Sequence, residues 1–142
     1  MIGTTYFKRF ASEDRIDRRV IKTSYLLTAL SCVAFVLIIG FVVDLLYDDA
    51  YSMVAPVAAV LSAGMCLHGL GDMFNRFLGA HGRGKELRNG AFLCGGVILV
   101  GSVVLVYLWG IWGAVVTKIT GDATYFFAMY KYYSSNVKHS SL

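Results

Sequence analysis

The chain has 142 residues and a formal net charge of +4, and 57% of its residues are hydrophobic. This hydrophobic share exceeds the roughly 45–50% that is usual for soluble domains, and the mean hydropathy is +0.63. Basic residues flank apolar runs, so we interpret them as topology signals and lipid-headgroup contacts, which argues against a nucleic-acid partner. Because no run alternates apolar and polar residues as a barrel strand would, the composition favours an all-α integral membrane protein with one domain.

Residues 1–20 form a basic lead-in before the first apolar run. Tyr6, Phe7 and Phe10 could enter the interface while the charged residues face water, which favours a short amphipathic helix on the membrane surface. A plain solvated lead-in explains the same residues. The excess of Lys and Arg places this segment in the cytoplasm under either interpretation.

Four apolar stretches of about twenty residues are each long enough to cross a hydrocarbon core of roughly 30 Å. We expect a transmembrane domain over 21–133, with antiparallel up-down spans at 21–43, 50–74, 90–109 and 114–133. Residues 134–142 are expected to form a polar cytoplasmic tail.

A polar hairpin over 75–89 separates the second and third expected spans. Arg76, Arg83, Lys85 and Arg88 face only one acid there, and glycines allow the chain to reverse. The connections after the first and third spans carry no Lys or Arg. The positive-inside rule therefore predicts a cytoplasmic basic hairpin and cytoplasmic termini at both ends.

Ionisable residues inside the second span are candidates for function, because such groups are rare and costly in a membrane. His68, Asp72 and Arg76 follow one another at intervals of four, so they share one face of a helix. Asp72 and Arg76 could be an ordinary interfacial ion pair. For His68, a hydrogen bond between helices is the leading interpretation and a proton relay is the alternative.

The last span carries a second polar stripe at Lys118, Asp122 and Tyr125. Asp122 is expected near the bilayer centre, so the stripe should face protein or a water-filled cavity, with Val116, Ile119 and Phe127 toward lipid. Lys118 could instead extend to the outer interface. A transport role for Asp122 and simple charge pairing with Lys118 remain alternatives.

Other patterns point away from catalysis. No P-loop, GxSxG or HExxH motif is present, and the three cysteines stand at no ligand-like spacing, so we interpret them as packing residues. We therefore expect no enzymatic activity, no metal and no cofactor.

Ala55, Ala59 and Ala63, with Gly71 in the same row, form a small-residue stripe suited to close helix contact. General alanine richness is the alternative.

The hairpin and the last span together resemble a known family. The features are a helix ending in Asn75, the sequence LGAHGRGK over 78–85, Arg88-Asn89, and Gly-x-x-Gly-Ala over 110–114. Over roughly residues 6–133 the chain is similar to the C-terminal part of bacterial polysaccharide flippases of the MATE-like exporter superfamily. Those proteins have about a dozen spans in two lobes, and they usually carry a small or apolar residue where this chain has Lys118.

The resemblance implies transport of a lipid-linked oligosaccharide across the bacterial cytoplasmic (inner) membrane, for lipopolysaccharide, O-antigen or capsule synthesis. Asp122, Lys118, Tyr125, His68, Asp72 and Arg76 are the candidate transport-path residues. Four spans cannot enclose an alternating-access cavity, so the expected partners are membrane lipids and either further transporter helices or other membrane subunits. The alternative is a small four-helix structural or assembly protein, or a transporter fragment without activity of its own.

Overall fold

The computed structural model describes residues 15–47, 51 and 53–139, and this part of the chain contains three α-helices. They are α2 (Arg18–Leu46), α3 (Val54–Ala80) and α4 (Gly84–His139). All three are long and apolar enough to cross a membrane. The all-α class is therefore confirmed, together with a composition suited to a membrane.

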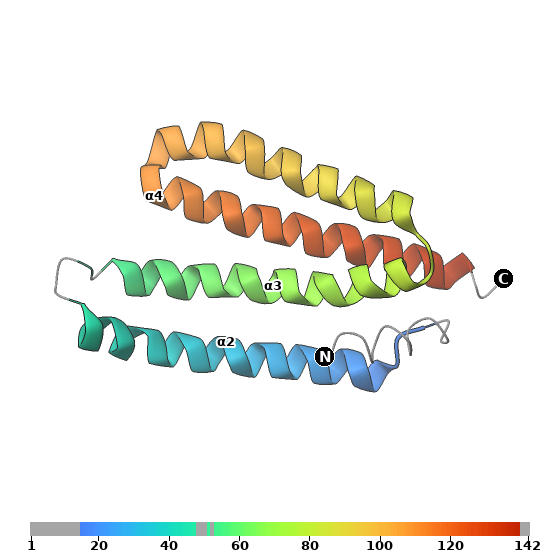
Figure 1. The fold of residues 1–142 in the computed structure, drawn as a ribbon, viewed down its shortest axis with the longest axis horizontal. Coiled ribbons are helices and arrows are strands. Elements are labelled where there is room, and N and C mark those ends of the chain that lie inside the picture. The colour runs from blue at the N-terminus through green and yellow to red at the C-terminus, as the bar shows by residue number, and fades with distance from the viewer. Residues whose placement is uncertain (1–14, 48–50, 52, 140–142) are drawn as a thin grey trace.

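The number of helices differs from the four predicted, because α4 contains both of the last two expected spans. Gly110 alone is non-helical inside α4 (φ 55°, ψ −128°), and it joins two helical arms, 84–109 and 111–139. The ribbon reverses direction at this point, so the arms lie side by side (Figure 1). No separate loop over 109–113 is needed, because glycine tolerates a positive φ that other residues rarely adopt.

The turn between α3 and α4 is also shorter than predicted. The expected hairpin over 75–89 is helical except for His81, Gly82 and Arg83. Gly82 has φ 67°, the Arg83 amide donates to the Leu78 carbonyl at 3.0 Å, and the Gly82 amide donates to the Gly79 carbonyl at 3.1 Å. These two bonds form a Schellman motif, which satisfies the last carbonyls of α3 and ends the helix within three residues.

The remaining boundaries shift by a few residues. Helix α2 extends beyond 21–43 at both ends, and α3 begins and ends later than 50–74. The expected tail continues as helix to His139. The proposed interfacial helix involves residues 1–14, which lie outside the described residues, as do Asp48 and Asp49 of the first connection.

Helix α3 lies between α2 and the 111–139 arm of α4, and the 84–109 arm packs on the far side of that second arm (Figure 1). The start of α2, the α3–α4 turn and the C-terminal end of α4 are at one end of this row, and the reversal between the two arms of α4 is at the other. A row has two outer elements, and most side chains of α2 and of the 84–109 arm are exposed. In the most apolar window of α2 only 6% of the residues are buried, so lipid or other protein must cover these surfaces.

The buried core is concentrated at the end that carries the α3–α4 turn. Phe74, Phe77 and Leu78 of α3 are almost fully buried there, together with Met129 of α4. The ring of Tyr133 packs on both phenylalanines, at centroid distances of 5.0 and 5.2 Å. This aromatic core fixes α3 against the last turns of α4. It thereby sets the register of the polar residues of both helices that lie farther from the turn.

Candidate functional site

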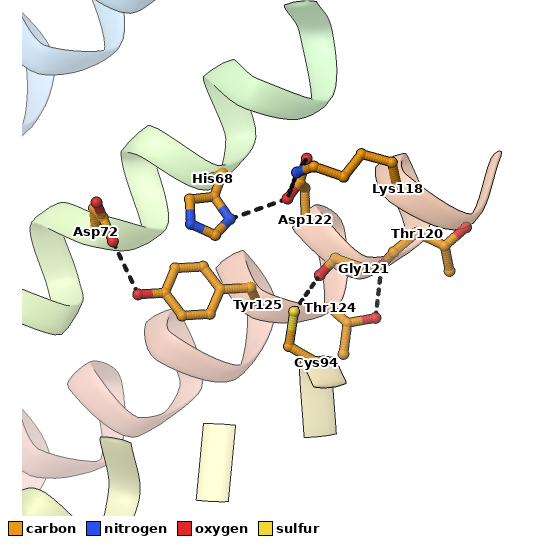
Figure 2. A network of polar contacts seen from close by, with 9 residues as sticks. All are labelled: His68, Asp72, Cys94, Lys118, Thr120, Gly121, Asp122, Thr124 and Tyr125. Atoms are coloured by element: carbon orange, nitrogen blue, oxygen red, sulfur yellow. Dashed lines mark hydrogen bonds and ion pairs between the residues drawn. The ribbon is translucent and has the colours of Figure 1, made fainter. Parts of the chain in front are cut away.

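Asp122 is the centre of a polar cluster between α3 and α4. Its side chain is 1% exposed, and both of its carboxylate oxygens accept hydrogen bonds from Lys118 Nζ at 2.5 Å. His68 Nδ1, from α3, lies 3.0 Å from Asp122 Oδ1 (Figure 2). The carboxylate thus joins the two helices, and its charge is balanced by the ammonium group one helical turn away.

A second contact extends the cluster toward the basic turn. The hydroxyl of Tyr125 donates to Asp72 Oδ1 at 3.0 Å, and the Tyr125 ring stacks on the His68 imidazole with centroids 4.5 Å apart and planes at 15°. Figure 2 shows His68 and Asp72 on α3 facing Asp122 and Tyr125 on α4. The two polar stripes predicted on separate helices therefore meet as a single cluster.

Two glycines of α3 allow this close approach. A Cβ atom at Gly64 would lie 3.0 Å from Asp122 Oδ2, and one at Gly71 would lie 2.9 Å from the Tyr125 ring. Gly71 belongs to the stripe identified in the sequence, but Ala63 of that stripe is exposed. The contact with α4 therefore uses Gly71 of the stripe together with Gly64, which the sequence prediction did not include because a lone glycine has no distinctive sequence signal.

The cluster lies near the middle of helical segments that are long and apolar enough to cross a membrane. His68 is twelve residues from the end of α3 at Ala80, which corresponds to about 18 Å along the helix axis. Asp122 is twelve residues beyond the reversal at Gly110, so it is equally far from that end. Both residues are therefore far from the ends of their helical segments, and a hydrocarbon core to be crossed is roughly 30 Å thick.

The edges of the cluster are not covered by the part of the chain that the structure describes. The side chains of His68 and Lys118 are 41% and 40% exposed, whereas Asp122 is enclosed. Lys118 does not extend to the outer interface, since its ammonium group turns toward Asp122 and the middle of the arm. With His68 Nδ1 bound to the carboxylate, Nε2 is the ring atom left for another partner.

The expected orientation of the 111–139 arm is largely correct. Asp122 and Tyr125 are buried, and Val116 and Phe127 are exposed. Ile119 is the exception, because its side chain is directed toward Gly64 on α3 and away from lipid. Threonines 117, 120 and 124 donate to carbonyls one turn earlier in their own helix, so their hydroxyls are satisfied outside the cluster.

Arg76 and the basic hairpin do not join the cluster. Arg76 is exposed, and Asp72 pairs with Tyr125 where an ion pair with Arg76 had been considered. Arg83 donates to Asn136 Oδ1 at 2.6 Å and lies 3.4 Å from Glu86 Oε1, so it connects the turn to the end of α4. Lys85 and Arg88 are exposed near the same turn, where they can contact lipid headgroups.

The contact between α2 and α3 is of a different kind. Cys32 Sγ lies 3.7 Å from Ser62 Oγ, and Cys66 Sγ donates to the Thr28 carbonyl at 3.7 Å. Beside these contacts is an open, mainly apolar groove of about 520 Å³. The groove has no signal in the sequence, because its walls come from two helices and each wall resembles ordinary membrane-span sequence.

The cluster is suited to holding charge and moving protons. Its groups are a carboxylate, an ammonium, an imidazole and a phenol, which can bind a polar ligand or exchange a proton. Within the described residues, no three His, Cys, Asp or Glu side chains gather in a way that could hold a metal ion.

Comparison with known proteins does not identify the chain. No family model, curated protein or solved structure matches it.

Proposed function

We propose that this protein is a membrane transport component, similar to the C-terminal helices of a polysaccharide flippase, that works within a larger helical assembly. The observation that carries the proposal is the cluster of His68, Lys118 and Asp122, which lies near the middle of its helices and is open on one edge. We infer that it is central in the membrane. A charged side chain facing lipid at this depth costs at least about 2.5 kcal/mol. The open edge therefore requires water or polar protein beside it, as the wall of a transport path provides.

The distribution of charge supports an orientation for this component. Among the described residues, all Lys and Arg except Lys118 lie toward one end of the row. They are near the start of α2, around the α3–α4 turn, and in the last turns of α4. We infer that the two arms of α4 cross the membrane separately, giving four crossings in total. The basic end is then cytoplasmic, with both termini on that side.

The resemblance in the turn and at the Gly110 step supplies the substrate class, a lipid-linked oligosaccharide in the bacterial inner membrane. Its diphosphate would be attracted to exposed basic residues such as Lys85 and Arg88, and its sugars would pass polar groups of the cluster. Rocking of this bundle against the remaining helices would then open the path to alternate sides. No covalent step is involved.

The decisive experiment compares two variants in the complete assembly, with export of lipid-linked oligosaccharide as the readout. Asp122→Asn retains the size of the side chain and removes its charge, so we expect export to be lost while the protein stays inserted and abundant. Thr124→Val is the matched control, because the Thr124 hydroxyl bonds only to its own helix backbone, and export should persist.

A second candidate function is that of a structural or assembly protein. It is favoured by the fact that both carboxylate oxygens of Asp122 already accept hydrogen bonds within the chain. Lys118, one turn away on the same helix, already bonds both carboxylate oxygens, as it would if it only balanced the charge of a carboxylate that joins α4 to His68 of α3. Replacing both residues by leucine removes both charges together. Retained export in the Lys118→Leu/Asp122→Leu double variant would refute the transport role, and lost export with normal insertion would refute the purely structural one.

A further inference from the structure

Cys32 and Cys66 face one another across the boundary between α2 and α3. The two helices are antiparallel, and their cross-helix contacts pair Cys32 with Ser62 and Cys66 with Thr28. The two thiols stand one helical turn apart in this register. Neither is in a disulfide, and neither is fully buried.

Both cysteines also line the groove of about 520 Å³ between these helices. Phe35 and Met65 contribute apolar walls to it, and Gly69 leaves open space in its floor. An apolar reagent dissolved in the bilayer can therefore reach the thiols directly. Cys94 differs, because it is buried between the two arms of α4, where its thiol donates to the Gly121 carbonyl at 3.3 Å.

We propose that Cys32 and Cys66 form a cross-helix dithiol site for apolar thiophilic ligands, of which a trivalent organoarsenical is the representative. The two sulfurs bind the arsenic, and the groove receives the organic substituent. This inference does not depend on the transport proposal, since it uses only the α2–α3 boundary.

The reaction with phenylarsine oxide balances without an oxidant. Two As–S bonds form as two S–H bonds and the arsenic–oxygen bond break. Both thiol protons leave with the oxygen as one molecule of water, and arsenic stays trivalent. Because the two sulfurs belong to different helices, the product fastens α2 to α3.

The experiment uses the full chain in detergent micelles, exposed to phenylarsine oxide and then washed with a monothiol. Intact mass spectrometry measures the retained phenylarsenic. The Cys94→Ser variant keeps Cys32 and Cys66, and it should retain the arsenical about a hundredfold better than a single thiol, because the second bond forms at high effective concentration. A dithiol such as 2,3-dimercaptopropanol should release it.

The matched control is Cys66→Ser, which also has two thiols, Cys32 and Cys94, but places them at different helix boundaries. It should lose the arsenical in the monothiol wash. Equal retention by both variants would overturn the proposal, as would failure of the Cys94→Ser variant to bind while its helical circular dichroism is normal. Denaturation in SDS before exposure should abolish the difference, because the fold creates the pair.

Discussion

The two faces of α3 form unlike contacts with their neighbours. Toward α4, Gly64 and Gly71 permit near backbone contact, and an ion pair, an aromatic stack and a phenol–carboxylate bond occupy the boundary. Toward α2, sulfur contacts at 3.7 Å border an open groove. In lipid, where helices gain little from hydrophobic burial against one another, packing and polar contacts decide association. We therefore expect α3 and α4 to act as one unit and α2 to be the more easily displaced helix.

The largest effect is expected from removing one charge of the α3–α4 boundary. Lys118→Leu leaves the buried Asp122 without its ammonium partner, and the free energy of unfolding in detergent should fall by about 3–5 kcal/mol. The Lys118→Leu/Asp122→Leu double variant should recover most of that loss. Unfolding followed by circular dichroism during SDS titration measures both variants, and a double variant no more stable than the single one would contradict the pairing.

A matched pair of glycine substitutions tests the two faces of α3 directly. A side chain at Gly71 would collide with the Tyr125 ring and approach the Phe126 backbone, so Gly71→Leu should cost about 1–3 kcal/mol of unfolding free energy. Gly69 lies two residues away beside the groove, and a Cβ atom there meets nothing within 4 Å. Gly69→Leu should therefore leave stability unchanged or higher. Similar losses in the same SDS titration would show that the two boundaries are packed alike.

A smaller effect is expected from Tyr125→Phe. The substitution keeps the ring stacked on His68 but removes the hydroxyl that donates to Asp72. Hydrogen bonds between membrane helices contribute about 0.6 kcal/mol on average, so the loss should be of that order. A double-mutant cycle with Asp72→Ala isolates the contact, and a coupling energy of zero would show that the hydroxyl and the carboxylate do not interact.

The smallest effect is expected at the basic turn. Arg83→Ala removes the bond to Asn136 and the weak ion pair with Glu86, both exposed to solvent, so stability should fall by only about 0.2–1 kcal/mol. Proteolysis at the end of α4 is the more sensitive measurement and should become faster. Lys85→Ala, two residues away and exposed, is the control that should leave the rate unchanged.

The sequence was most informative where one segment suffices to define a property. The helical class and the approximate positions of α2 and α3 follow from apolar length and flanking charge. The i, i+4 spacing placed His68 with Asp72 and Lys118 with Asp122 on common faces, and the cost of an acid in lipid predicted the burial of Asp122. The structure did not place Arg76 in the cluster, because Asp72 has the Tyr125 hydroxyl as a partner from α4.

Helix ends and partners depended on interactions that no single segment contains. The hairpin over 75–89 contains enough polar residues and glycines to suggest a loop, yet the Schellman bonds at Gly82 shorten the turn to three residues. Gly110 allows α4 to reverse without a loop. The bond from Cys94 Sγ to the Gly121 carbonyl and the close approach of Gly113 to the Leu105 backbone hold its arms together.

The sequence by itself determined that this chain is helical, apolar and basic at one end, because periodicity, hydropathy and charge are properties of single segments. Only the tertiary structure decided that His68 meets Asp122, that Cys32 and Cys66 line the same groove, and that one face of α3 is closely packed while the other is open. Those pairings depend on the register and rotation of helices against one another. Register and rotation are set by the shapes of both surfaces at once, here by Gly64 and Gly71 on α3 and by Asp122 and Tyr125 on α4.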